Sequence, residues 1–257
     1  MTKRSVLGAI TVALLVTGTT VGTTVDTTIG TTVGAGAATR TPGGVSRDYE
    51  PKIRPADFGG PIDNPYFPLV PGARWVYDVS TPTGPERIVV EVTHDTKEVL
   101  GIDAVVVRDT VSKDGALVED TFDWYAQDTA GNVWYLGEDT KEYENGVAVN
   151  TKGSWEAGVD GAQPGIVMKA HPRVGATYRQ EFYKGEAEDR ARVLSVSESA
   201  SVPFGTFERN IVKTKDITPL QPGFVEHKYY ARDIGVVLEI DVKGGSERVE
   251  LVEHTTP

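Results

Sequence analysis

Hydrophobic and polar residues alternate with a period of two along most of the chain after residue 73. In the first such stretch Trp75, Tyr77 and Val79 fall on one side and their neighbours fall on the other. This spacing is typical of β-strands, whose successive side chains point to opposite faces. About ten to twelve short strands separated by Gly-rich turns predict an all-β fold, either an antiparallel β-barrel or two packed half-barrel meanders. Asp114–Gly115 and Asn145–Gly146 predict tight hairpin turns.

The chain also repeats its landmarks at a nearly fixed distance. Gly72 and Gly175 lie 103 positions apart, and so do Arg87 and Arg190. A fixed offset between matching segments indicates duplication of one folding unit. The repeat therefore predicts that two similar sets of strands build the domain.

The repeat also defines the expected domain boundaries. Residues 64–257 are predicted to form a single β domain made of two units, at about 70–136 and 172–253. The segment between the units, 137–171, has no counterpart in the repeat. Its Gly and Pro residues predict a long shaped loop.

The N-terminal part has the layout of an export signal. A basic start precedes an apolar run over 6–16, which is too short to cross a bilayer, and an A-x-A site ends at Ala37. Residues 1–37 are therefore predicted to be a signal peptide, followed by a flexible linker over 38–63. The mature protein is expected to be secreted, extracellular or in the cell envelope, with no integral membrane segment.

Composition narrows the chemistry. The chain has 257 residues, no Cys and a formal net charge of −11. Without Cys, neither disulfides nor thiolate metal ligands are available. The acidic balance argues against a nucleic-acid partner and against adhesion to an anionic membrane. The sequence contains no motif of a serine hydrolase, a zinc protease or a nucleotide-binding loop, so no cofactor is predicted.

Carboxylates and aromatic residues are mixed within 119–125. Asp120 and Trp124 fall on the more apolar side of this predicted strand, and Tyr125 falls on the other side. An ionised Asp120 on an apolar side is costly unless it is paired. It is interpreted either as one half of a buried ion pair or as an acid in a pocket. The candidate partners are Arg87, Arg179 and Arg190.

Trp155 lies in the unrepeated segment and is predicted to belong to a lid, because long ordered loops on a β scaffold often carry binding surfaces. His171 ends the same segment and Glu181 follows soon after. Alternatively, His171 is only solvated in a turn, and the charges around Glu181 belong to an exposed hairpin. The predicted ligand contacts are Trp155, Asp120, Trp124, Tyr125, Glu181 and His171.

Two other functions remain open at this point. Asp120, Glu181 and Glu188 are the candidate carboxylates of a secreted hydrolase or lyase. Asp128 begins a turn that contains Gly and Asn, as in a calcium-stabilised cell-envelope protein. Ala130 occupies a position where a calcium loop needs an oxygen ligand, so an ordinary hairpin turn is the alternative.

Several stretches resemble a group of uncharacterised exported bacterial proteins, namely Asp123–Asp128, Gly131–Tyr135 and Gly153–Gly158. Tyr230–Val237 resembles a signature of secreted β-rich domains, and the likeness covers most of 64–253. Proteins of this group are similar to lipocalin-like or open-barrel folds. The resemblance implies a secreted β-rich domain and transfers no catalytic residue.

These observations favour a secreted, non-catalytic binding protein. It is expected to hold an apolar or amphipathic small ligand at one mouth of a β-barrel, where small-molecule sites commonly lie. The hydrophobic ligand is the only partner that the sequence suggests.

Overall fold

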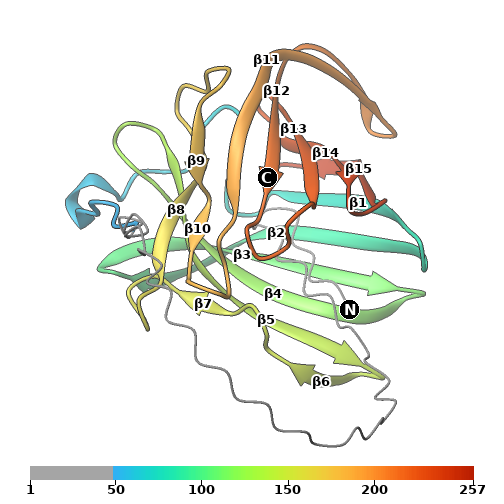
Figure 1. The fold of residues 1–257 in the computed structure, drawn as a ribbon, viewed down its shortest axis with the longest axis horizontal. Helices are drawn as coiled ribbons and strands as arrows, with labels where there is room; N and C mark the ends of the chain where they lie inside the picture. The colour runs from blue at the N-terminus through green and yellow to red at the C-terminus, as the bar shows by residue number, and fades with distance from the viewer. Residues whose placement is uncertain (1–48) are drawn as a thin grey trace, which may run out of the picture.

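The structure is a computed structural model that describes residues 49–257. Within this range the chain forms strands and one short 3₁₀ helix, η1 (Pro55–Asp57) (Figure 1). The strands of the first half are β1 (Arg74–Thr81), β2 (Gly84–Val99), β3 (Ile102–Lys113), β4 (Ala116–Gln127), β5 (Val133–Glu144), β6 (Val147–Asn150), β7 (Trp155–Glu156) and β8 (Gln163–Met168). Those of the second half are β9 (Thr177–Arg179), β10 (Glu181–Phe182), β11 (Arg190–Val202), β12 (Gly205–Ile217), β13 (Val225–Ala231), β14 (Gly235–Lys243) and β15 (Arg248–Thr255). The predicted all-β class is confirmed.

All the strands belong to one antiparallel sheet that curls round on itself (Figure 1). Its main path runs β10-β8-β5-β4-β3-β2-β1-β15-β14-β13-β12-β11-β9, and β6 and β7 pair with β5 beside this path. The β1–β15 pair joins the first half to the second. The path's two ends, β10 and β9, are consecutive in the chain, with Gln180 alone between them. The curl is therefore completed by the chain itself and not by a hydrogen-bonded strand pair.

Gly165 in β8 is required where these two ends meet. A Cβ at position 165 would lie 2.2 Å from the Gln180 carbonyl carbon and 2.5 Å from the Glu181 nitrogen. Such distances are far inside van der Waals contact, so a side chain here would push β8 away from β10. The glycine thus allows the curled sheet to come together.

The two tight turns predicted from dipeptides are confirmed. Asp114 and Gly115 have φ angles of 52° and 79°, and Asn145 and Gly146 have φ angles of 52° and 77°. Two successive residues at positive φ make a type I′ turn, whose twist matches that of the flanking strands. These turns connect β3 to β4 and β5 to β6.

The segment 137–171 differs from the long loop that was expected. It contains the second half of β5 together with β6, β7 and β8. Gly137, at φ 134°, breaks the alternation within β5, and a Cβ there would lie 2.3 Å from the Trp155 carbonyl oxygen. Gly137 therefore allows β7 to pair with β5, and it also interrupts the alternation from which a strand would have been predicted.

The residues before β1 cover one end of the sheet. Ile62 and Leu69 form a β-bridge, and the Phe67 ring packs on Tyr125 at 5.6 Å between ring centroids.

The predicted signal peptide 1–37 lies outside the described residues, and the predicted linker 38–63 is described only from residue 49. In the described part of the chain, no helix is long and apolar enough to cross a membrane.

Local geometry recurs at nearly the offset seen in the sequence. Gly72 N–H donates to the Val92 carbonyl at 2.8 Å, and Gly175 N–H donates to the Val193 carbonyl at 2.9 Å. The end of β2 and the end of β11 are 103 positions apart, as are the starts of β3 and β12. Duplication of one unit would produce this agreement and stays a prediction.

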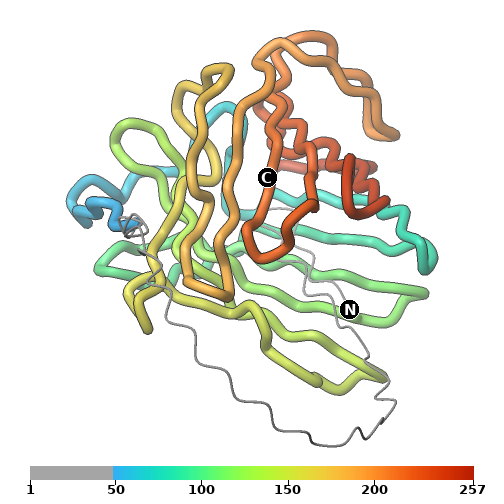
Figure 2. The backbone as a smooth tube through the Cα atoms, viewed as in Figure 1, coloured from blue at the N-terminus to red at the C-terminus, as the bar shows by residue number. Residues whose placement is uncertain are grey.

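The β11–β12 hairpin is the longest projection from the sheet and bends over its outer half (Figure 2). Within this hairpin Arg209 and Asn210 have φ angles of 64° and 59°, and the pairing register shifts between Val193 and Ala200. At the tip, the Phe204 N–H donates to the Leu251 carbonyl of β15 at 3.0 Å. The hairpin therefore arches back and rests on the strand next to β1.

Candidate functional site

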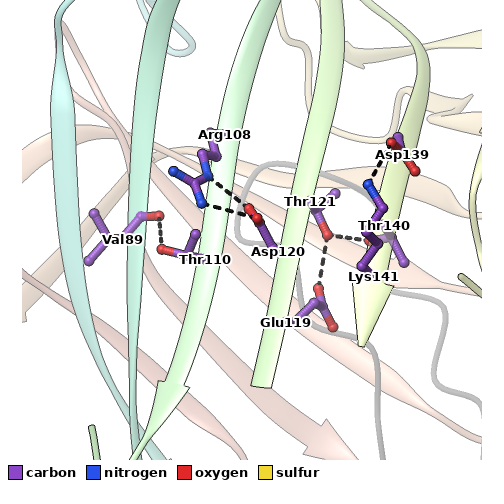
Figure 3. A network of polar contacts seen from close by, with 9 residues as sticks. All are labelled: Val89, Arg108, Thr110, Glu119, Asp120, Thr121, Asp139, Thr140 and Lys141. Atoms are coloured by element: carbon purple, nitrogen blue, oxygen red, sulfur yellow. Dashed lines mark hydrogen bonds and ion pairs between the residues drawn. The ribbon is translucent and has the colours of Figure 1, made fainter. Parts of the chain in front are cut away.

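The inward face of β4 is the reverse of the expected one. Glu119, Thr121 and Asp123 are buried, and Asp120 lies on the outer face. There the Arg108 guanidinium donates to both Asp120 oxygens, Nε to Oδ1 at 2.8 Å and Nη2 to Oδ2 at 3.0 Å (Figure 3). This hydrogen bond raises the pKa of Arg108. Asp120 is therefore one half of an ion pair, with a partner that sequence reasoning did not name.

The matching strand of the second half shows the same reversal. In β13 the charged residues Glu226 and Lys228 point inward with Tyr230, and the intervening residues are only half-buried. The alternation of charged and uncharged residues in β13 was visible in the sequence. This alternation indicates a period of two, but no feature of the neighbouring residues indicates that the charged side faces the interior.

The interior is consequently rich in charge. Within residues 49–257 nine carboxylates and one amine, that of Lys228, are buried. The carboxylates belong to Asp109, Glu119, Asp123, Glu138, Glu181, Asp189, Asp216, Glu226 and Glu239. Burying so many acids is unusual, because an ionised carboxylate loses much of its hydration free energy when it leaves water.

Lys228 organises the carboxylates of the second half. Its Nζ lies 3.5 Å from Glu226 Oε2 and 3.5 Å from Glu239 Oε1. Burial alone would lower the pKa of Lys228, but these carboxylates raise it above its ordinary value. Burial raises the pKa of Glu226 to about 7, and burial likewise raises that of Glu239, against the effect of the ammonium. At neutral pH the cluster therefore retains protons that exposed carboxyl groups would already have released.

Asp216 belongs to the same cluster and is held by neutral donors. The Thr214 hydroxyl donates to Asp216 Oδ1 at 2.5 Å, and the Gln180 amide donates to Oδ2 at 3.0 Å. A cavity of about 10 Å³ lies beside it, which is room for one water molecule at most. Its lining includes Asp189, Asp216, Thr218, Phe224, Glu226 and Lys228. This cavity is too small for an organic ligand.

Buried tyrosines connect the carboxylates of the two halves. Burial raises the pKa of Tyr77, and two carboxylates raise it further, Glu239 of β14 and Asp109 of β3, from strands on either side of β1. Burial also raises the pKa of Tyr125, with Asp123 and then Asp109 adding to the effect. Because Tyr77 responds to Glu239 of the second half and to Asp109 of the first, the charged residues of both halves share one interior.

Three of the predicted ligand contacts come together inside this interior. The Tyr125 ring stacks on Tyr135 at 5.0 Å, and the Trp155 ring meets Tyr135 edge-on at 5.3 Å. Glu181 is fully buried and raises the pKa of Tyr125, after burial and nearer carboxylates. Trp155 is therefore part of the packed interior and not an exposed lid. Trp124 lies apart, beneath the Lys97 ammonium at 4.4 Å.

His171 lies elsewhere, in a pocket of about 520 Å³ at one end of the sheet. The pocket is formed by the segment before β1, the β4–β5 and β13–β14 turns, the residues after β8 and the middle of β11 and β12. Its lining includes Asn64, Tyr66, Gln127, His171, Val196 and Arg232. Of the six predicted contacts, His171 is the one that lines this pocket.

Hydrogen bonds fix the walls of this pocket. Asn64 Nδ2 donates to the Gly131 carbonyl at 2.9 Å and to the Lys169 carbonyl at 3.3 Å, and the Asn64 N–H donates to Gln127 Oε1 at 2.8 Å. The Asp233 N–H donates to the Pro65 carbonyl at 2.6 Å. Four separate chain segments are thereby held in place around an open volume.

The turn at Asp128 is a hairpin turn and not a calcium loop. Its carboxylate accepts hydrogen bonds from the N–H groups of Ala130 and Asn132, each at 2.9 Å, and from Trp134 Nε1 at 2.8 Å. Burial alone would raise the pKa of Asp128, but these bonds lower it overall. Among the residues that the structure describes, no group of three or more His, Asp or Glu side chains is placed to hold a metal ion.

The carboxylates suggested for a hydrolase do not converge. Asp120 pairs with Arg108 on the outer face, and Glu181 is buried. Glu188 accepts a hydrogen bond from the Gly185 N–H at 3.0 Å and lies 4.0 Å from Arg179 Nη1. None of the three lines either cavity described above.

Comparison with known proteins gives remote likenesses in structure. No family model and no curated protein matches the chain. One similar structure is a candidate exported protein with a YmcC-like fold from Bacteroides fragilis, with 16% identity, a TM-score of 0.44, and coverage of 74% of this chain and 99% of that one. Another is a candidate lipoprotein from Parabacteroides distasonis, with 13% identity, a TM-score of 0.40, and coverage of 74% and 98%. These likenesses assign no function.

Proposed function

We propose that the chain is an exported, non-catalytic binding protein whose ligand is an amphipathic small molecule held in the end pocket. The observation that carries the proposal is the 520 Å³ pocket with hydrogen-bonded walls. A volume of this size is typical of small-molecule sites, which range from about 300 to 1,000 Å³.

The lining of the pocket suits a ligand with both apolar and polar parts. Tyr66 and Val196 offer apolar surface, and Arg232 and His171 offer hydrogen-bond donors. The sheet interior is a poorer place for an apolar molecule, because the buried side chains there include many carboxylates. The proposed site is therefore the pocket at the end of the sheet and not the middle of the curl.

The export component rests on the sequence. The basic start, the short apolar run and the A-x-A site over 1–37 support cleavage and secretion. The absence of Cys is compatible with export, provided that burial alone stabilises the domain. Duplication of one unit, supported by the recurring turn hydrogen bonds, would account for the scaffold on which the pocket is built.

Binding is tested with the mature protein and the neutral fluorescent amphiphile N-phenyl-1-naphthylamine. We expect saturable fluorescence enhancement that Val196→Trp abolishes, because the indole would fill the pocket. The matched control is Val242→Trp, since Val242 is a similarly exposed valine outside the pocket. Circular dichroism checks that both variants fold. Absence of saturable binding by the folded wild-type protein would refute the proposal, as would equal effects of the two substitutions.

A further inference from the structure

Arg232 is the basic side chain of the pocket, and its guanidinium has little to do in the structure. Its ion pair is with the adjacent Asp233, at 3.7 Å between Nε and Oδ2, and both side chains are mostly exposed, at 56% and 76%. An exposed pair at this distance contributes little stability. The five N–H donors of the guanidinium are therefore available to a ligand.

The backbone beneath Arg232 is held firmly. Arg232 follows the last residue of β13, and the next residue, Asp233, donates its N–H to the Pro65 carbonyl at 2.6 Å. Ile234 N–H donates to the Ala231 carbonyl at 3.3 Å and closes the turn. The Cα of Arg232 is thus fixed in the pocket wall, and only its side chain has to be ordered when a ligand binds, which limits the entropic cost.

The one carboxylate in the pocket lining is engaged by a neutral donor. Asp63 Oδ1 accepts a hydrogen bond from Gln127 Nε2 at 2.6 Å, and within the described chain Asp63 forms no ion pair with Arg232. The guanidinium is therefore not neutralised from inside the pocket. A planar fork of N–H donors matches the two oxygens of a carboxylate or phosphate.

We infer that the ligand of this pocket carries an oxyanion head, a carboxylate or a phosphate, that binds Arg232. Its apolar body lies along Tyr66 and Val196. This inference rests on the proposed function, because it assigns the chemical class of the molecule that the same pocket holds. Although the chain as a whole is acidic, the lining of this pocket contains one carboxylate, that of Asp63, and one guanidinium, that of Arg232.

The test compares ligands that share one tail and differ in the head. Decanoate, decyl phosphate, decanol and decylamine are titrated against the mature protein as competitors of N-phenyl-1-naphthylamine. We expect the two anions to bind about tenfold more tightly than decanol, the scale of one charge-assisted contact, and decylamine to bind most weakly. A preference between carboxylate and phosphate then identifies the source of the oxyanion.

Arg232→Gln provides the decisive variant. It should remove the preference for anions, so that decanoate and decyl phosphate bind no more tightly than decanol does to the same variant. Arg87→Gln is the matched control, because Arg87 is 54% exposed and forms an equally loose ion pair, at 3.8 Å to Asp78, outside the pocket. Asp63→Asn should strengthen anion binding a few-fold by removing a negative charge from the lining.

The possible failures are distinguishable. If no competitor of any charge displaces the probe, the proposed function itself fails. If decanol and decanoate compete equally, or if the preference for anions survives in Arg232→Gln, the pocket binds amphiphiles but the oxyanion inference is overturned.

Discussion

The ammonium group of Lys228 lies 3.5 Å from the Glu239 carboxylate, in a part of the interior where the two side chains are only 4% and 1% exposed. A second carboxylate, that of Glu226, lies at the same distance. Truncating one partner of a buried ion pair leaves the other without compensation, which costs more than the pair itself contributes. Lys228 is therefore the interior residue on which the stability of the second half most depends.

Lys228→Met should lower the free energy of unfolding by about 3 kcal/mol at roughly pH 8. The loss should be smaller at roughly pH 5, because the carboxyl groups can then be protonated and no longer need the ammonium. Urea denaturation at both pH values measures the difference. Lys243→Met, at an exposed position near the end of β14, serves as the control and should change stability little. A loss that is independent of pH would contradict this account.

Stability should fall as the pH rises through the neutral range. Burial raises the pKa of Glu226 from an ordinary 4.5 to about 7 in the folded protein. The folded state therefore binds this proton more tightly than the unfolded state. The resulting stabilisation is complete below 4.5 and disappears as the pH rises through 7, a change of about 3 kcal/mol.

The free energy of unfolding is measured at a series of pH values between 4.5 and about 7, the ordinary and the raised pKa of Glu226. Burial shifts the pKa of Asp189, Asp216 and Glu239 in the same direction and strengthens the trend. Lys228 stays charged throughout, because its pKa is raised. Glu226→Gln should flatten the profile, and a stability that increases with pH over this interval would show that the cluster is not protonated as argued.

Gly165→Ala should destabilise the domain by about 2–3 kcal/mol, because the new methyl group collides with the Gln180–Glu181 peptide. Hydrogen exchange should then be faster at β8 and β10 than elsewhere. Gly205→Ala is a suitable control, since nothing lies within 4 Å of a Cβ at that position. Equal stability of the two variants would mean that the sheet ends need not approach so closely.

Asp120→Asn should cost less than about 1 kcal/mol, because the Arg108 side chain is 43% exposed and water screens the pair. It should also leave binding to the end pocket unchanged, since Asp120 lies on the outer face. Thermal unfolding and probe titration check both statements. A large loss of binding would restore Asp120 as a ligand contact.

A calcium chelator should leave the melting temperature unchanged. The Asp128 carboxylate is already saturated by backbone and side-chain donors within its own turn. Asp128→Ala, in contrast, should lower the melting temperature by several degrees, because it removes those bonds from a partly buried turn. Stabilisation of the wild-type protein by added calcium would contradict the assignment.

Local signals in the sequence predicted much of the secondary structure. Asp114–Gly115 and Asn145–Gly146 form turns because Gly and Asn tolerate positive φ wherever they occur. The segment 137–171 was misread for an equally local reason, because Gly137 interrupts an alternation that continues on either side of it. Its close contact with the Trp155 carbonyl is a tertiary fact that no neighbouring residue reveals.

The sequence by itself determined that this protein is built of β-strands and where most of its turns lie, because a period of two and a positive φ are properties of a few adjacent residues. Only the tertiary structure decided that Glu119 and Glu226 point inward, since alternation is the same whichever face is buried. It also brought Asn64, His171 and Arg232 around one pocket from distant segments. Those arrangements depend on how the whole sheet curls, and the curl is set by contacts between residues far apart in the chain.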